Sequence, residues 1–200
     1  MYEVELRTLL EDFDSAKEKL DFFAKPVRLN EREVTIFFHN PQKDDFDLRL
    51  KLRKNRNFLS FKELSPGNTK KEFESDVSDP GAVYEMLLKS GFKIRMIIPR
   101  VKYTYKHGKF EILLNRIIHN IPVLPLIEVE TVIDEKGDTK KIEQEIRDFM
   151  KNKLNLKNLL DDEKLGEINQ EGREMNFDSV SMGDLLDFVS HKKDDLKFSG

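Results

Sequence analysis

The chain has 200 residues, of which 36% are charged, and its 35 basic and 38 acidic residues nearly cancel to a net charge of -3. The absence of cysteine excludes disulfides, thiolate zinc sites and a cysteine nucleophile, and the near-neutral balance argues against a nucleic-acid-binding protein, which is usually strongly basic. Because no apolar run approaches the roughly 20 residues that span a bilayer, and no signal-peptide core opens the chain, we expect a cytoplasmic protein without membrane contacts.

Most strands are predicted from alternation of charged and apolar residues. Successive side chains of a strand point to opposite faces, so this pattern is typical of a strand with one polar and one apolar face. The predicted strands cover residues 2–9, 34–38, 46–53, 57–64, 70–77, 92–98, 100–107, 109–117 and 124–133. Turn-forming residues separate several of them, as at Pro66-Gly67-Asn68.

Helices are predicted between and after the strands, where apolar residues recur at helical spacing or a capping signal occurs. Asp79 followed by Pro80 is typical of a helix start, and Gly91 of a helix end. The predicted helices cover residues 14–24, 79–91, 139–153 and 161–166, with a last one from Ser181. We expect one domain over residues 1–190, strand-rich to about 133 and helical over 139–190, with 191–200 as a flexible tail.

The polar faces of the strands are sorted by charge. Arg49, Lys51 and Arg53 share one strand face, whereas Glu3 with Glu5, and Glu128 with Glu130, form acidic pairs. A merely solvated sheet face would mix signs to gain cross-strand pairs. The sorting therefore predicts an α+β fold, in which an antiparallel eight-stranded sheet forms a closed or nearly closed β-barrel with a polar interior and helices packed outside.

The two acidic pairs also indicate a metal site. Adjacent carboxylates repel each other unless a cation lies between them, and carboxylate oxygens are the ligands that hard divalent cations prefer. The cations elsewhere in the barrel would crowd one another. We therefore expect replacement of Lys62 or Arg53 to stabilise the ligand-free protein slightly.

In order, these motifs resemble the CYTH superfamily, or triphosphate tunnel metalloenzymes, which includes class IV adenylate cyclases, thiamine triphosphatases and inorganic tripolyphosphatases. The resemblance rests on Glu3-x-Glu5-x-Arg7, a basic alternating strand, Lys62, Lys70-x-Glu72-x-Glu74 and Glu128-x-Glu130. It spans residue 3 to about residue 130. Residues 181–186 also resemble the Ser-Tyr-x-Asp-Leu-Leu ending of the cyclase-like branch, with Met182 in place of the aromatic residue.

The resemblance implies a role for each matching position. Metal ligands for Mg²⁺ or Mn²⁺ would be Glu3, Glu5, Glu128 and Glu130. Phosphate-binding residues would be Arg7, Arg49, Lys51, Arg53, Lys62, Lys70, Arg100 and Lys102. Catalytic candidates would be Lys62, Glu72, Glu74 and Asn115. The family's Arg-x-Arg corresponds either to Arg49-x-Lys51 or to Lys51-x-Arg53.

One position departs from the family pattern. The strand before the last acidic pair usually carries an aspartate in the family, and here the position is Asn115, whose amide brings no negative charge. The link from Asn115 to Glu128 is long, apolar and without glycine, unlike the short link common in family members that make cyclic AMP. Both differences argue against cyclase chemistry and leave triphosphate binding intact.

Three functions stay open. The first is metal-dependent hydrolysis of an inorganic or organic triphosphate, the second is class IV adenylate cyclase activity, and the third is binding of polyphosphate or nucleotide without turnover. Tripolyphosphate, ATP and thiamine triphosphate are the expected partners, with no nucleic acid, and the protein would be a monomer or homodimer. Hydrolysis is preferred, because the chain has no tryptophan and only four tyrosines to stack on a base.

Overall fold

The computed structural model describes residues 2–63, 69–118, 124–133, 138–156, 159 and 180–192. Within them, strands and helices follow one another along the chain. The strands are β1 (Tyr2–Leu9), β2 (Lys25–Asn40), β3 (Lys43–Arg53), β4 (Asn57–Glu63), β5 (Thr69–Val77), β6 (Lys93–His107), β7 (Phe110–Ile117) and β8 (Leu124–Ile133). The helices are α1 (Phe13–Phe23), α2 (Pro80–Lys89), α3 (Thr139–Leu154) and α5 (Met182–Val189).

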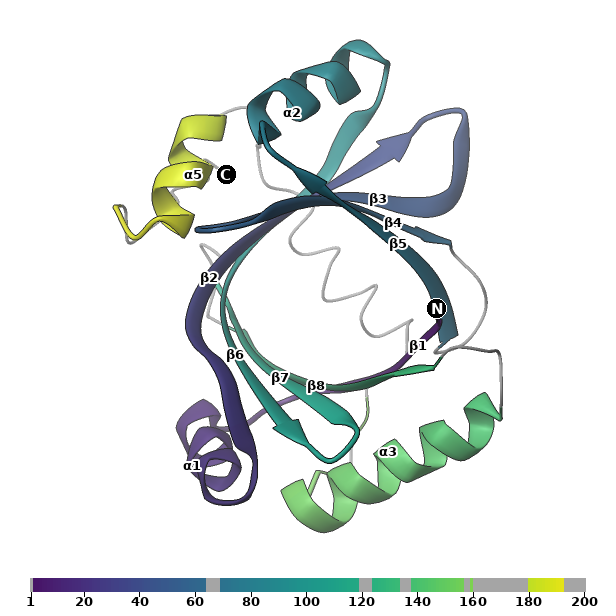
Figure 1. Cartoon of the computed structure of the whole chain (residues 1–200), viewed down its shortest axis with the longest axis vertical. Coiled ribbons are helices and arrows are strands. Elements are labelled where there is room, and N and C mark those ends of the chain that lie inside the picture. The colour runs from purple at the N-terminus through teal and green to yellow at the C-terminus, as the bar shows by residue number, and fades with distance from the viewer. Residues whose placement is uncertain are drawn as a thin grey trace.

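The strands form an antiparallel barrel in the order β1-β5-β4-β3-β2-β6-β7-β8 (Figure 1). The ring closes because β1 pairs on both sides. Its pairing with β8 runs from Tyr2 opposite Ile133 to Leu9 opposite Leu126. Its pairing with β5, among the described residues, covers Tyr2, Glu3 and Val4. The predicted α+β fold with an antiparallel, closed or nearly closed barrel is confirmed.

Two predicted strand boundaries were wrong. Residues 92–98 and 100–107 were predicted as two strands, but β6 runs through Pro99 without a break. Proline lacks a backbone donor, yet its carbonyl oxygen still accepts a hydrogen bond from Ile118 N at 2.9 Å and the residue keeps its place opposite Val34 of β2. Strand β2 begins at Lys25, directly after α1, and so is much longer than the predicted 34–38.

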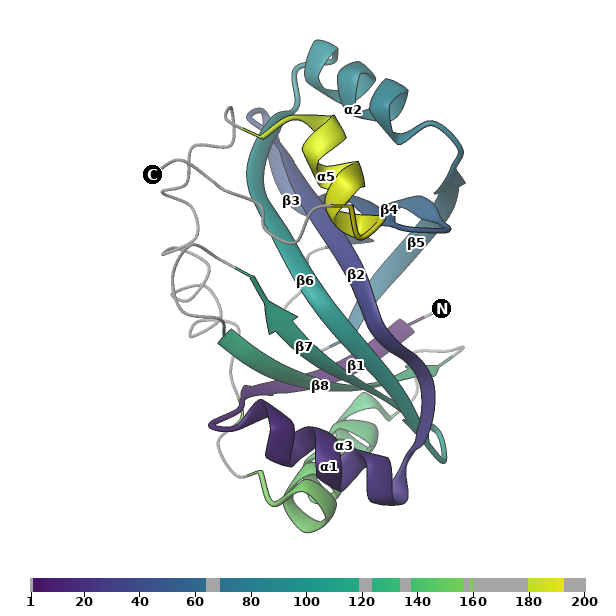
Figure 2. The ribbon, with the colours of Figure 1, turned by 90° about the vertical axis from the view of Figure 1, so that its left-hand side faces the viewer.

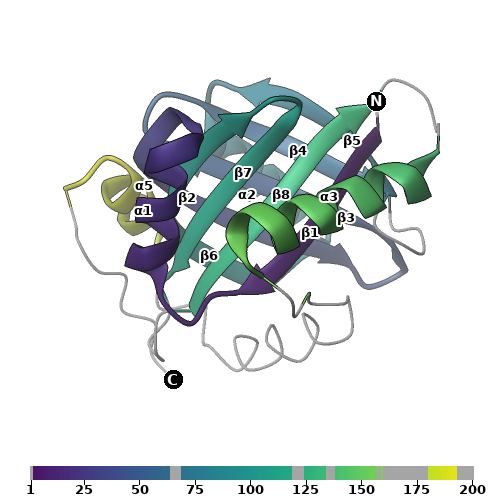
Figure 3. The same ribbon diagram turned by 90° about the horizontal axis from the view of Figure 1, so that it is seen from below.

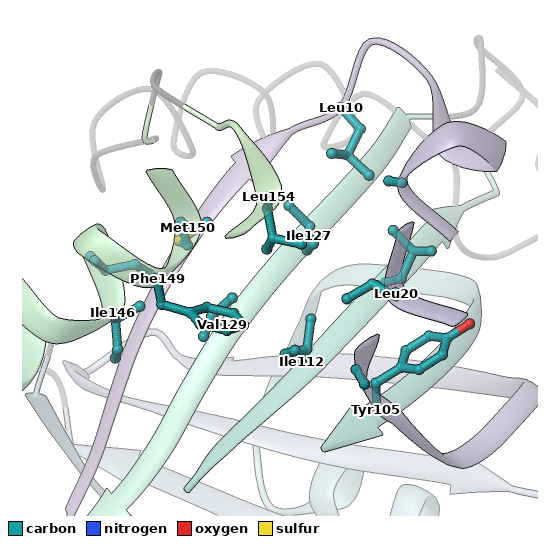
Figure 4. Close-up of a cluster of buried hydrophobic side chains, with 14 of the residues drawn as sticks. Leu10, Leu20, Tyr105, Ile112, Ile127, Val129, Ile146, Phe149, Met150 and Leu154 are labelled. Carbon is teal, nitrogen blue, oxygen red and sulfur yellow. The ribbon is translucent and has the colours of Figure 1, made fainter. Parts of the chain in front are cut away.

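Helices α1 and α3 cover the outer face of one side of the barrel (Figure 3). The side chain of Asp12 starts α1 by accepting hydrogen bonds from the backbone N–H groups of Asp14 and Ser15. Between these helices and the strands lies a core cluster (Figure 4), which includes Leu20, Tyr105, Ile112, Ile127, Val129, Ile146, Phe149, Met150 and Leu154. Because the apolar faces of the strands meet these helices, the charged faces point into the barrel.

Helix α5 lies against β2 and β3 on another side of the barrel (Figure 2). It begins with a capping box, in which the side chains of Ser181 and Asp184 each accept from the other's backbone N–H. This confirms the helix predicted from Ser181, whereas the helix predicted at 161–166 and most of the predicted tail lie outside the described residues. No helix among the described residues is long and apolar enough to cross a membrane.

Candidate functional site

The barrel encloses a charged cavity of about 570 Å³ to which all eight strands contribute. Because side chains alternate along each strand, one face of every strand points inward. The cations that line the cavity are Arg7, Arg28, Arg49, Lys51, Arg53, Arg56, Lys62, Arg95, Arg100 and Lys102. The carboxylates that line it are Glu3, Glu5, Glu33, Asp47, Glu72, Glu74, Glu111, Glu128 and Glu130.

Three of these carboxylates form a tight cluster. One oxygen from each of Glu3, Glu5 and Glu130 lies within 4.8 Å of the others, since Glu5 and Glu130 are opposite each other on β1 and β8. Burial, and then the charges of Glu3 and Glu128, raise the pKa of Glu130 well above its ordinary value. Burial also raises the pKa of Glu3. Three carboxylates crowded in this way fit a divalent cation, which would relieve their repulsion.

Glu128, the fourth predicted metal ligand, lies outside this tight cluster, beside Asn115. The Asn115 Nδ2 donates a hydrogen bond to Glu128 Oε2 at 3.2 Å, and Arg7 Nε lies 3.7 Å from Glu128 Oε1. Asn115 is fully buried, and its Oδ1 has no hydrogen-bond partner within the described part of the chain. The structure therefore places Asn115 as a neighbour of Glu128 rather than within the three-carboxylate cluster.

Lys62 connects the carboxylate cluster to the acidic residues of β5. Its Nζ lies 2.6 Å from Glu3 Oε1, 3.4 Å from Glu72 Oε2 and 3.7 Å from Glu5 Oε1. Lys62 is 3% exposed; burial opposes its charge, but Glu5 and Glu3 outweigh burial and raise the pKa of Lys62 above its ordinary value. The expectation that Lys62 is crowded by like charges was wrong, because carboxylates surround it.

Glu72 is the better buried of the two acidic candidates on β5. It accepts hydrogen bonds from Lys51 Nζ at 3.1 Å and from Ser60 Oγ at 2.5 Å. Burial alone would raise its pKa, but the charges of Lys51 and Lys62 lower the pKa of Glu72 to about 2. Glu74 pairs with the same Lys51 at 2.9 Å, with 38% of its side chain exposed. Both carboxylates therefore fix the position of a lysine.

Glu33, which the sequence analysis missed, is the centre of a buried basic cluster. Its carboxylate lies 2.5 Å from Arg53, 3.1 Å from Lys102 and 3.2 Å from Arg100. Burial would raise its pKa, but Arg100, Lys102 and Arg53 hold the pKa of Glu33 well below its ordinary value. The predicted strand began at 34, whereas β2 begins at Lys25; a start only one residue earlier than predicted would already have put Glu33 in phase with Thr35 on the inner face.

A second missed group surrounds Asp47. Arg49 Nη2 lies 2.8 Å from Asp47 Oδ2, Arg95 forms an ion pair with the other oxygen, and both guanidinium groups lie near the ring of Phe37. The alternation with Arg49 would have identified Asp47. Alternation would not have identified Arg95, because the pairing of β2 with β6 shifts between Phe37 and Phe38 and the regular inward–outward alternation of β6 is interrupted there.

The barrel brings together nearly all of the predicted site residues. The four predicted metal ligands, the acidic candidates Glu72 and Glu74, and every predicted phosphate-binding residue except Lys70 line the cavity. Asn115 lies behind Glu128 instead. The Lys70 side chain lies outside the described residues, although the backbone of Lys70 pairs with Glu3.

The fold and the cavity define a class of protein: an antiparallel barrel with a charged tunnel as its interior. No family model matches the chain, and no curated protein matches it significantly. Solved structures do match it. The PH1819 protein from Pyrococcus horikoshii OT3 is 21% identical, with a TM-score of 0.71 over 84% of this chain and 99% of that chain.

Two further matches are structures described as candidate cyclases. One, from Vibrio parahaemolyticus, is 14% identical, with a TM-score of 0.66 over 93% of this chain and 98% of that chain. The other, from Hippeastrum, is 18% identical, with a TM-score of 0.55 over 76% of this chain and 87% of that chain. The chain therefore shares its fold with these solved structures, as the resemblance of its motifs implied.

Proposed function

We propose that the protein binds a triphosphate-containing small molecule together with a divalent metal ion inside the barrel and hydrolyses the terminal phosphate. The observation that carries this proposal is the placement of the Glu3, Glu5 and Glu130 cluster and a wall of cations in one cavity, with Lys62 in contact with Glu3. A triphosphate carries about four negative charges, which Arg and Lys side chains match in charge and in hydrogen-bonding geometry.

Glu3, Glu5 and Glu130 would hold the metal ion, with Glu128 beside them. A bound Mg²⁺ or Mn²⁺ supplies charge that offsets the phosphate oxygens. The cations that would hold the phosphates are Arg7, Arg49, Lys51, Arg53, Lys62, Arg100 and Lys102, all of which line the cavity. In the reaction, water adds to the terminal phosphorus and loses a proton to solvent, the bond to the bridging oxygen breaks, and orthophosphate is released while the bridging oxygen stays on the remaining diphosphate.

The catalytic candidates differ in what their surroundings allow. With a pKa of about 2, Glu72 stays ionised at neutral pH and accepts protons poorly, so it positions Lys51 and Lys62 rather than acting as a base. Lys62 stays protonated and stabilises charge on the phosphates. Asn115 orients Glu128 through its hydrogen bond. The Hippeastrum protein with this fold is described as having a dominant triphosphatase activity, which supports hydrolysis here.

A second candidate function, cyclisation of ATP, is favoured by an apolar patch in the same cavity. Phe37, Met96 and Ile98 form a small buried cluster with Ile117 against it, and all four line the cavity. Such a surface could contact a base or another organic group attached to the triphosphate. In that reaction the ribose 3′-hydroxyl attacks the α-phosphorus and pyrophosphate leaves.

One experiment separates these functions. Purified protein is incubated with Mg²⁺ or Mn²⁺ and with tripolyphosphate, ATP or thiamine triphosphate, and the products are resolved by chromatography. Orthophosphate release supports the hydrolase, cyclic AMP with pyrophosphate supports the cyclase, and binding without product supports a binding module. As a control on the site, Glu128→Gln should abolish turnover at ordinary Mg²⁺ concentrations without altering the fold; unchanged turnover would contradict a role for Glu128 at the metal site.

A further inference from the structure

A second cavity, of about 320 Å³, lies beside the tunnel and is basic. It is lined by residues of β2, the β3–β4 turn and the end of α5: Arg28, Glu31, Arg32, Arg53, Lys54, Asn55, Arg56, Val189 and His191. We call this cavity the mouth groove. Among the described residues that line it, Glu31 is the one carboxylate against five fixed positive charges.

The mouth groove is continuous with the tunnel. Arg28, Arg53 and Arg56 line both cavities. Arg28 connects them electrostatically, because its guanidinium lies 3.5 Å from Glu31 in the groove and 3.5 Å from Glu111 in the tunnel. Glu111 is in turn opposite Glu130 of the carboxylate cluster, on β7 and β8. A linear molecule that carries several anionic groups could therefore extend from the tunnel into the groove and remain in contact with cationic side chains.

Like Arg28, three further groove cations have a partner within the protein, which distinguishes them from Lys54. Arg53 pairs with Glu33 in the tunnel, and Arg56 pairs with Asp76 at 2.5 Å. Arg32 Nη1 donates to the carbonyl oxygen of Phe188 at the end of α5. Lys54 is exposed at the turn and has no ion pair within the described part of the chain.

The ring of Phe58 gives the junction between the two cavities a fixed shape. The Arg53 and Arg56 guanidinium carbons lie 4.7 Å and 5.3 Å from its centroid, so both side chains pack against the same aromatic ring. Held in this way, they lose less conformational freedom when they bind an anion. The junction is therefore prepared for phosphate groups before any ligand arrives.

From this arrangement we infer that the mouth groove binds the protruding part of a linear polyphosphate that is longer than a triphosphate. This inference rests on the proposed function, because it assumes that one end of the same chain occupies the tunnel. Each phosphate unit carries a negative charge, which the excess of cations in the groove attracts at short range. Lys54 lines the groove but not the tunnel, and unlike Arg32, which donates to Phe188, it is exposed at the turn. It therefore tests this site without removing a tunnel side chain.

The test compares Lys54→Glu with a matched charge reversal, Lys140→Glu, in an exposed residue of α3. Affinities for tripolyphosphate and for a longer linear polyphosphate are measured by calorimetry at low salt, with a chelator present so that hydrolysis does not interfere. Lys54→Glu should weaken binding of the longer chain by about fivefold or more and binding of tripolyphosphate far less, and the difference should shrink at high salt. Lys140→Glu should match the unmodified protein with both probes.

Other outcomes separate this inference from the proposed function. If Lys54→Glu weakens the binding of both probes equally, or leaves the binding of the longer chain unchanged, the groove is not a binding site for polyphosphate. If tripolyphosphate fails to bind any variant even when Mg²⁺ replaces the chelator, while the longer chain keeps its dependence on Lys54, the groove stands and the proposed tunnel function fails. Lys54-dependent binding of single-stranded RNA without binding of polyphosphate would overturn the inference in favour of nucleic acid.

Discussion

Lys62 Nζ lies 2.6 Å from Glu3 Oε1, so a buried ammonium group occupies the side of the carboxylate cluster that faces β4. Glu5 and Glu72 lie within 3.7 Å of the same nitrogen. Lys62 therefore acts as an internal counterion for carboxylates that would otherwise repel one another. It both stabilises the ligand-free cavity and competes with any divalent cation for Glu3.

This double role predicts opposite effects of Lys62→Gln on the two ligands. Metal affinity of the ligand-free protein should rise, because a competing positive charge beside Glu3 is lost. Tripolyphosphate binding should weaken by about 1.5–3 kcal/mol, the usual range for a charge-assisted hydrogen bond. Calorimetric titrations with Mg²⁺ and with tripolyphosphate measure both quantities. Lys71→Gln, on the exposed Lys71–Glu63 pair, serves as the control, and parallel changes in both affinities would refute the role.

Glu33→Gln should be strongly destabilising. It leaves Arg53, Arg100 and Lys102 close together without their shared buried carboxylate, and loss of one partner from a buried ion pair costs about 3–5 kcal/mol. Glu74→Gln removes a carboxylate from a more exposed pair with Lys51, which is worth about 1 kcal/mol or less. Urea denaturation of the two variants checks the contrast; similar midpoints would contradict it.

The pH dependence of stability should show the contribution of Glu33. Its folded pKa is lowered well below the ordinary value of 4.5, so the folded state binds fewer protons there than the unfolded state. The stabilisation by ionised Glu33 is fully present above about pH 4.5 and is lost as the pH falls through the pKa of Glu33 in the folded state. Unfolding free energy should therefore fall less steeply with acid in Glu33→Gln than in the unmodified protein, and identical slopes would count against this assignment.

Asn115→Asp tests the position at which this chain departs from the family. The aspartate would replace a hydrogen-bond donor to Glu128 by a second buried negative charge. Without metal, the variant should lose about 1–3 kcal/mol of stability, and added Mg²⁺ should restore more stability to it than to the unmodified protein. Asn115→Ala loses the same hydrogen bond without adding charge and should not respond to metal in this way. Thermal unfolding of both variants and of the unmodified protein, with and without Mg²⁺, measures these differences in stability.

Glu130→Gln should stabilise the metal-free protein and weaken its metal binding. The change removes one charge from a cluster in which burial and neighbouring carboxylates disfavour ionisation. Thermal unfolding without metal should therefore occur at a higher temperature than in the unmodified protein, whereas added Mg²⁺ should raise the melting temperature less. A lower melting temperature without metal would show that Glu130 is a structural partner in the sheet.

The sequence was most informative where alternation was strict. The basic face of Arg49, Lys51 and Arg53, and the acidic pairs, were predicted because period-two alternation places such residues on one face, and they do line the cavity. Strands that break alternation were harder to predict. The inner face of β2 continues from Glu33 to the uncharged Thr35 and Phe37, so no charged alternation marked Glu33. Arg95 turns inward at a shift in strand pairing that no local sequence pattern predicts.

Contacts between residues on different strands could not be predicted from the sequence either. Carboxylates on β1 and β8 were expected to share a metal, but the tighter grouping of Glu3, Glu5 and Glu130, with Glu128 set towards Asn115, depends on the register between those strands. Likewise, the partners of Lys62 come from two other strands. Such ion pairs follow from the shear of the barrel rather than from any single segment.

The way β1 closes the ring has a consequence for folding. Its main partner, β8, lies at the other end of the strand-rich region, so the loop-closure entropy for this pairing is large and folding is expected to be slow. In the described part of the chain, the opposite seam, between β1 and β5, is held at fewer paired positions than the seam with β8, so we expect it to open more readily. Amide hydrogens at that seam should therefore exchange with solvent before those between β1 and β8, and the barrel would open there while the rest of the sheet stays intact.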